Sequence, residues 1–166
     1  MATNVARARD RPSSSATSRA AVKRESSLVH ETPPTNISYN DGNIRFLIKE
    51  FPILGEDSLK LSKFALAVKI AHGDEIYKTV HDILIKMKAP PNERALDKIL
   101  NNLNLNTELV QNAMKSNEVD GMIAYTRALA EQLKISGTPT FIMNDELIRG
   151  YVPFDTLISI VANKRD

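Results

Sequence analysis

The sequence has no cysteine and no tryptophan, and aromatic residues make up only 5% of its 166 residues. A chain without thiols forms no disulfide, no thiolate metal site and no cysteine nucleophile. Because aromatics are scarce, the core has to be built from aliphatic side chains and methionine. The content of 42% apolar and 25% charged residues is ordinary for a globular protein, and the length predicts one domain.

Several other signals are missing. No run of about 18 uninterrupted apolar residues occurs, so we expect no membrane-spanning helix. No apolar signal-peptide core, Gly-rich phosphate loop, Gly-x-Ser-x-Gly or His-Glu-x-x-His is visible. His30, His72 and His81 show no metal-ligand spacing; His72 follows a helix, and His81 is adjacent to an apolar helix face. We therefore expect no cofactor and no metal site.

The net charge of +2 is unevenly distributed along the chain. Residues 1–24 hold six basic side chains and one acidic one, which leaves sixteen basic and nineteen acidic side chains after them. Residues 1–40 are rich in Arg, Ser and Pro, and this composition predicts a disordered tail, because little apolar surface offsets the ordering entropy. A transit peptide fits residues 1–24 loosely. A nucleic-acid-binding arm fits less well, because the arginines are spread out without aromatic residues between them, so we expect no nucleic-acid partner.

The first regular elements are predicted after residue 40. Residues 44–49 are rich in β-branched and aromatic side chains and predict a strand, which ends before Pro52 because proline cannot donate to a ladder. Apolar residues at intervals of three and four then predict a series of helices within 57–134. Asp57 is expected to cap the first of them, and Asn92 a later one.

The last part of the chain predicts a hairpin and a helix. Two short apolar runs make a hairpin over 140–149, turning at Asn144-Asp145, where both residues tolerate a positive φ. Pro153 suits the first turn of a terminal helix over 153–163. The order of a strand, a helical segment, a hairpin and a helix predicts an α/β domain in which helices cover a small sheet.

Three separate segments resemble DsbA-type thiol-disulfide oxidoreductases, in the order in which that family has them. Asn43–Gly55, ending in Glu-Phe-Pro-Ile-Leu-Gly, resembles the strand after the family's active-site helix. Gly137–Phe141 resembles the family's cis-proline loop, and Gly150–Asp155 resembles the start of its last helix. The helices over 57–134 match the family's insertion in size. The resemblance implies a thioredoxin-like α/β domain over 41–166.

The resemblance leaves out the part of the family that carries its chemistry. In the family, the central strand and a Cys-x-x-Cys at a helix N-terminus precede the strand matched at 44–49. Nothing in residues 1–42 resembles either one. We therefore expect an incomplete sheet that lacks its central strand, with a gap between 44–49 and 140–143. Buried unpaired backbone groups cost about 1–3 kcal/mol each, which favours a compromised sheet, partial disorder or a strand supplied by a partner.

The family resemblance also implies a binding site and a partner class. The family's proline loop exposes the backbone of the preceding residue to a substrate peptide, which here makes Thr138 and Pro139 the substrate-binding residues, with a cis bond between them. The implied partners are protein or peptide thiols and disulfides. The implied location is the bacterial envelope or periplasm, although no signal peptide is visible.

The expected function follows from the missing sulfur. Thiol-disulfide exchange needs a thiolate, so no catalytic residue is assigned. We expect a truncated or degenerate member of the family, without redox activity of its own. Two alternatives remain: a non-catalytic peptide-binding module that uses the proline loop, or an enzyme resembling the kappa-class glutathione transferases, which can orient glutathione's thiol with a hydroxyl. The latter needs an N-terminal strand and helix that the sequence does not show. The sequence predicts no oligomeric state.

Overall fold

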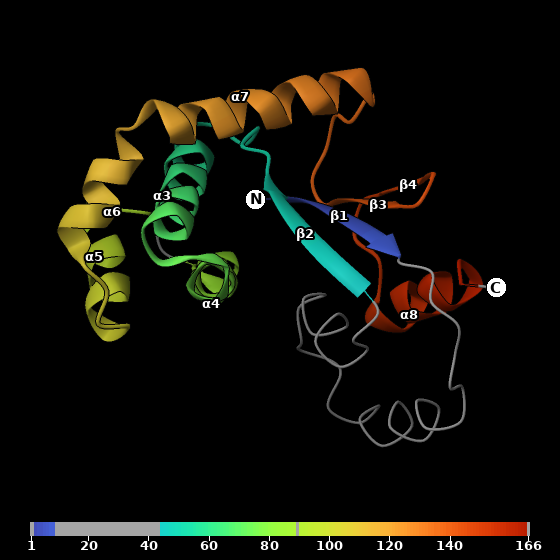
Figure 1. The fold of residues 1–166 in the computed structure, drawn as a ribbon, viewed down its shortest axis with the longest axis horizontal. Coiled ribbons are helices and arrows are strands. Elements are labelled where there is room, and N and C mark those ends of the chain that lie inside the picture. Colours follow the sequence, from blue (N-terminus) through green and yellow to red (C-terminus); the bar gives the residue numbers. More distant parts are fainter. Residues whose placement is uncertain (1, 9–43, 89, 166) are drawn as a thin grey trace, which may run out of the picture. The chain divides into compact units, whose positions relative to one another are not determined.

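The structure is a computed structural model that describes residues 2–8, 44–88 and 90–165 (Figure 1). The chain divides into two compact units. The first holds Lys49–Thr138 with the start of the chain, and we call it the helical unit. The second holds Asn4–Ile48 and Pro139–Asp166, and we call it the sheet unit. Within the described residues, no helix combines the length and the apolar character needed to span a bilayer.

The helical unit forms where the sequence predicts the insertion. Its helices are α3 (Glu56–His72), α4 (Asp74–Lys86), α5 (Glu93–Asn102), α6 (Thr107–Met114) and α7 (Asn117–Gln132). Helix α3 is the central one and packs against α4, α6 and α7. Its five consecutive residues Phe64–Val68 are all buried, so α3 is apolar on every side along this stretch. A helix of this kind is stable only inside a core.

Side-chain caps begin most of these helices. Asn92 accepts a hydrogen bond from the Ala95 amide at 2.9 Å, as the sequence predicts. Asn106 accepts one from the Leu109 amide at 3.1 Å at the start of α6. The predicted cap at Asp57 is wrong, because α3 begins at Glu56 and has Gly55 before it, with no side-chain cap. Glu56 and Asp57 instead lie in the first turn, where the helix dipole favours acidic groups.

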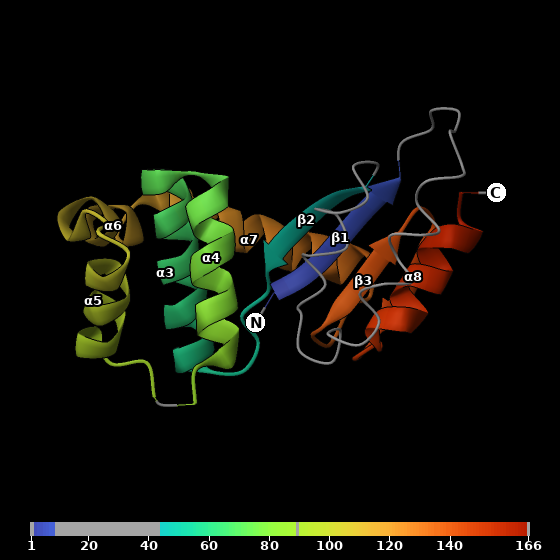
Figure 2. The ribbon, with the colours of Figure 1, turned by 90° about the horizontal axis from the view of Figure 1, so that it is seen from below.

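The sheet unit holds β3 (Thr140–Met143), β4 (Glu146–Arg149) and most of β1 (Ala2–Ala8) and β2 (Ile44–Glu50). The first two residues of β1 and the last two of β2 belong to the helical unit. The order of the described strands is β2-β1-β3-β4. Figure 2 shows β1 between β2 and β3. β1 runs parallel to β3, and β3 pairs with β4 as an antiparallel hairpin. Asn144 in the hairpin turn has a φ of 54°, a value that asparagine tolerates well. The predicted hairpin over 140–149 is confirmed.

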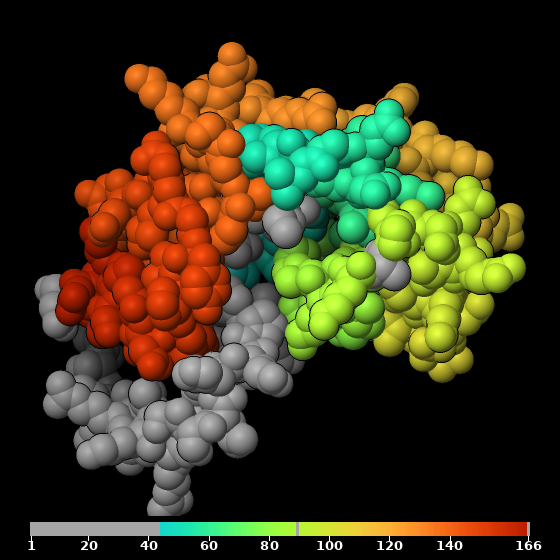
Figure 3. All heavy atoms as spheres, turned by 180° about the vertical axis from the view of Figure 1, so that it is seen from behind, coloured from blue at the N-terminus to red at the C-terminus, as the bar shows by residue number. Residues whose placement is uncertain are grey.

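Helix α8 (Phe154–Asn163) packs on the hairpin and closes the core of the sheet unit. The buried residues of this core are Phe141, Met143 and Leu157. Partly buried apolar side chains surround them: Ile148, Val152, Ile160 and Val161. In the space-filling view, β3, β4 and α8 form one packed block of side chains (orange to red, Figure 3).

The central position of the sheet is occupied, which corrects the expectation of a missing strand. β1 lies between β2 and β3, where a gap was predicted. Strand pairing uses backbone N–H and C=O groups, so an extended segment can fill such a position without the β-branched pattern that marks a strand in a sequence. Of the predicted tail over 1–40, residues 2–8 form β1, and residues 9–40 lie outside the described part of the chain.

Candidate functional site

The predicted proline loop joins α7 to β3. Thr138 ends the helical unit and Pro139 begins the sheet unit, and each is half-buried. The Pro139 carbonyl accepts a hydrogen bond from the Gly150 amide at 2.9 Å, so the end of β4 holds the start of β3 in place. Gly150 has a φ of 86°, a conformation that suits glycine. The role of Thr138 and Pro139 in binding a substrate stays a prediction.

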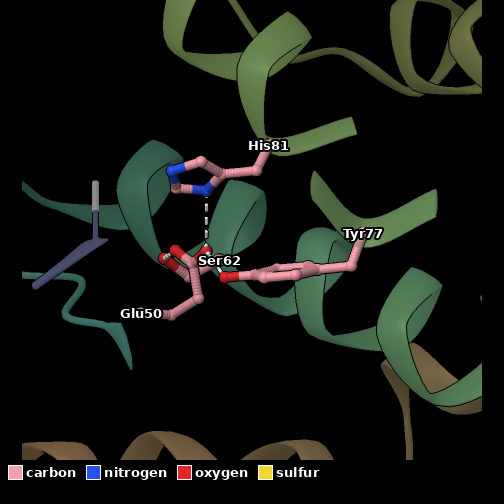
Figure 4. A network of polar contacts seen from close by, with 4 residues as sticks. All are labelled: Glu50, Ser62, Tyr77 and His81. Atoms are coloured by element: carbon pink, nitrogen blue, oxygen red, sulfur yellow. Dashed lines mark hydrogen bonds and ion pairs between the residues drawn. The ribbon is translucent and has the colours of Figure 1, made fainter. Parts of the chain in front are cut away.

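Apart from the proline loop, a cluster of buried polar side chains lies around Glu50, the last residue of β2 (Figure 4). Its carboxylate is buried, with only 4% of the residue exposed. Ser62 Oγ donates to Glu50 Oε2 at 3.0 Å, and Tyr77 Oη donates to Oε1 at 2.8 Å. His81 Nδ1 lies 3.1 Å from the same Oε1. An ionised carboxylate only accepts hydrogen bonds, so the His81 proton that serves it lies on Nδ1.

The local sequence explains why these four groups meet. Tyr77 and His81 are four residues apart and therefore share one face of α4, with their ring centroids 5.7 Å apart. Ser62 lies on the buried part of α3, next to the apolar run that forms the core. Glu50 is the last residue of β2 and lies beside these helices. Pro52, two residues later, cannot donate a ladder hydrogen bond, so the strand does not continue past it. We call Glu50, Ser62, Tyr77 and His81 the Glu50 network.

The charges of the Glu50 network reinforce one another. Burial by itself raises the pKa of Glu50, but the hydrogen bond and charge of His81 and the hydrogen bond of Tyr77 bring that pKa below its ordinary value. Burial also raises the pKa of Tyr77 well above its ordinary value, and the Glu50 charge and hydrogen bond raise it further. Glu50 is therefore an anion, and Tyr77 remains a neutral donor to it.

The chemistry open to this network is limited. Its carboxylate is already served by three protein donors, and it contains no thiol or other strong nucleophile. In residues 2–8, 44–88 and 90–165, no group of His, Asp and Glu side chains is placed to hold a metal ion. The network therefore fastens the end of β2 to α3 and α4, and this role is structural.

The network was not predicted from the sequence. His81 was interpreted only as a neighbour of an apolar face. The available signal was the buried stripe of α4, where Tyr77 and His81 alternate with Val80 and Leu84. Two polar rings on such a stripe need a buried partner, but the sequence alone does not say that the partner is Glu50.

Comparison with known proteins places the fold and identifies the family. The model of the DSBA-like thioredoxin domain matches residues 36–162. The chain belongs to this family. The match confirms the predicted thioredoxin-like, DsbA-type fold with its helical insertion. No curated protein matches the sequence.

Solved structures agree with this family. A thioredoxin-like oxidoreductase from Silicibacter pomeroyi is 30% identical with a TM-score of 0.70, and the match covers 99% of this chain and 86% of that one. The thiol-disulfide exchange protein alpha-DsbA2 from Wolbachia pipientis is 25% identical with a TM-score of 0.71, covering 98% and 81%. A periplasmic thioredoxin-like protein from Salmonella enterica serovar Typhimurium is 20% identical with a TM-score of 0.65, covering 99% and 84%, and shows the shared fold alone.

Proposed function

We propose that this polypeptide is a member of the DsbA-like family that has no redox activity of its own and acts by binding other polypeptides. The observation that carries the proposal is the absence of cysteine from a sequence of this family. Thiol-disulfide exchange begins when a thiolate attacks a disulfide sulfur and forms a mixed disulfide. The hydroxyl oxygen of Ser or Thr cannot form that intermediate, so no side chain of this chain replaces the missing sulfur.

The proline loop is the part of the chain that would hold a bound polypeptide. The proposal assigns main-chain recognition to Thr138 and Pro139, with an extended peptide pairing beside the loop. It is supported by the bond from Gly150 to the Pro139 carbonyl, which holds one side of the loop rigid. It is also supported by Tyr151, which follows Gly150 and is 83% exposed, since exposed aromatic side chains are common anchors in protein recognition.

The glutathione-transferase alternative receives no support from the family match or from the structures named above. A function of binding without catalysis makes a different prediction from a glutathione-transferase function, because it does not depend on sulfur. A peptide that contains no sulfur would bind the proline loop as well as one that does, because the backbone is what is recognised.

Two assays on the purified protein test this function. In oxidation of a dithiol peptide and in reduction of insulin, we expect rates equal to those of buffer, with the Wolbachia pipientis exchange protein as the positive control. Catalysis that survives repeated purification would contradict the proposal. Binding is measured by fluorescence anisotropy with an extended peptide in its cysteine-containing and serine-containing forms, for which equal affinities are expected.

Variants of the loop separate recognition of the backbone from recognition of the side chain. Thr138→Pro removes the backbone N–H of residue 138 and should weaken peptide binding. Thr138→Val keeps the backbone and should leave binding unchanged. The opposite order, with Thr138→Val the more damaging change, would show that the hydroxyl is the recognised group and would refute main-chain recognition. Circular dichroism of both variants checks that each is folded.

A further inference from the structure

The strand β1 is the one described strand that lies outside the segment matched by the family. The match covers residues 36–162, whereas β1 covers Ala2–Ala8. β1 nevertheless occupies the central position, between β2 and β3. Its register on β3 places Asn4 opposite Phe141, Val5 opposite Ile142 and Ala6 opposite Met143. The middle of the sheet is thus filled by residues that lie outside the family model's match.

The residues of β1 are poorly suited to that position. Central parallel strands are covered on both faces and are usually continuous runs of Val, Ile and Leu. The sequence of β1 is Ala-Thr-Asn-Val-Ala-Arg-Ala, with Val5 as its only β-branched aliphatic residue. Asparagine and alanine are both depleted in strands.

The mismatch is largest where the neighbouring strand is most buried. Phe141 and Met143 are 4% and 7% exposed and form the core of the sheet unit together with Leu157. The β1 positions in register with them hold a polar residue, Asn4, and a small one, Ala6. How well a residue suits a strand depends on its fit to the neighbouring strands and on burial, while the backbone bonds are available to almost any sequence. A strand with aliphatic residues at these two positions would therefore pair better than β1.

We propose that the position of β1 is an exchange site, at which an extended apolar segment of a different polypeptide displaces Ala2–Ala8 and pairs with β2 and β3. A second copy of this chain is the weaker occupant, because it brings the same seven residues and gains nothing at the two mismatched positions. This site is separate from the proline loop, and its occupant needs no sulfur.

The probe is a fluorescent peptide with the β1 sequence and the changes Asn4→Val and Ala6→Ile. The matched control peptide carries Thr3→Val and Arg7→Ile, which introduce the same two residue types at positions that alternate to the other side of the strand. Anisotropy with the full chain should show binding of the probe and much weaker binding of the control. Equal affinities for the two peptides would overturn the proposal, because the register on Phe141 and Met143 would then not matter.

Changes in the chain itself locate the binding. Val5→Pro removes a ladder donor from β1 and should strengthen probe binding by about tenfold, because the site no longer has to be vacated first. Asn4→Val with Ala6→Ile in the chain improves its own strand and should weaken probe binding by a similar factor. Probe binding that is the same in all three proteins would place the peptide elsewhere and refute the exchange site.

Two further variants guard against a misfolded protein and against binding of the probe at the proline loop. If Val5→Pro prevents folding, as seen by circular dichroism, the Asn4→Val/Ala6→Ile protein still gives the predicted loss of affinity. The Thr138→Pro variant should bind the probe normally, which distinguishes the exchange site from the proline loop. A dimer that forms by mutual exchange of β1, together with no binding of the probe, would show that a second copy is the occupant and would contradict the proposal.

Discussion

The helical unit and the sheet unit are held together in different ways. In the helical unit, α3 contributes five consecutive buried residues to the core, and the Glu50 network adds a set of satisfied buried polar groups. In the sheet unit, the core cluster consists of Phe141, Met143 and Leu157, and the central strand is Ala-rich. The comparison teaches that this chain keeps the family's inserted helices as a well-packed body. In the sheet unit, the central position is filled by β1, which lies outside the segment that the family model matches.

Truncation of the helical core should have the largest effect. Phe64 is only 1% exposed, and Phe64→Ala should lower the free energy of unfolding by about 3–5 kcal/mol through lost burial and a residual cavity. Urea denaturation followed by circular dichroism measures this. Leu109→Ala is the control, because Leu109 is 51% exposed, and its effect should stay within about 0.5 kcal/mol. Equal effects of the two changes would mean that α3 is not the centre of this unit.

Removal of the buried charge should come next. Glu50→Gln keeps the shape of the side chain but loses the anion that accepts three hydrogen bonds, and we expect a loss of about 1–3 kcal/mol. Glu56→Gln is the control, since Glu56 is exposed in the first turn of α3. Chemical denaturation at pH 7 compares them. A Glu50→Gln protein as stable as the parent would show that the network contributes nothing to the fold.

The same network predicts a dependence on pH. The pKa of Glu50 is lowered in the folded state, so its contribution to stability is fully present above the ordinary value of 4.5 and is lost as pH falls through the lower, folded pKa. The difference in stability between the parent and Glu50→Gln should therefore shrink below pH 4.5. Burial raises the pKa of Asp82, which has the opposite effect, but both proteins contain Asp82 and the comparison cancels it. A constant difference down to acid pH would contradict the prediction.

Improvement of the central strand should give a smaller gain, confined to the sheet unit. Asn4→Val with Ala6→Ile places strand-favouring aliphatic residues in register with Phe141 and Met143, and each change should add up to about 1 kcal/mol. Hydrogen exchange of β3 measures the gain locally. The matched control is Thr3→Val with Arg7→Ile. If the control stabilises β3 equally, the register on the core is not the cause.

The smallest effect is expected at the end of the hairpin. Lys164 Nζ lies 3.4 Å from Asp145 Oδ1 and 3.1 Å from Glu146 Oε2, at the surface. Exposed ion pairs of this kind contribute little, so Lys164→Ala should leave the melting temperature unchanged within error. A clear drop would show that the hairpin needs this contact to pack on α8.

The sequence was informative where local signals decide the structure. The helices between Glu56 and Gln132, the hairpin and the cap at Asn92 follow from apolar periodicity and turn chemistry, and the structure confirms them. The N-cap of α3 was predicted two residues too late, at Asp57, whereas the structure has Gly55 as the N-cap residue, without a side-chain cap. Boundaries of this kind depend on a few dihedral angles and not on the pattern of the whole helix.

Two features were beyond the reach of the sequence because they depend on partners far along the chain. The sequence of β1 shows no strand pattern. Its place in the sheet comes from the backbone groups of β2 and β3, and even β2, the nearer of the two in the sequence, begins more than thirty residues after β1. The Glu50 network joins residues from β2, α3 and α4, and His81 lies 31 positions from Glu50. A local sequence pattern does not predict a contact between residues so far apart in the chain.

Hydrogen exchange of the whole chain, read by mass spectrometry at the level of single elements, tests the contrast between the two units most directly. We predict that the amides of Phe64–Val68 exchange only with global unfolding, whereas those of Ala2–Ala8 exchange far faster through local release of the strand. The apolar probe peptide should leave α3 unchanged and speed exchange in the displaced strand further. Protection of Ala2–Ala8 equal to that of Phe64–Val68 would contradict the account, because β1 would then be as firmly built in as the helical core.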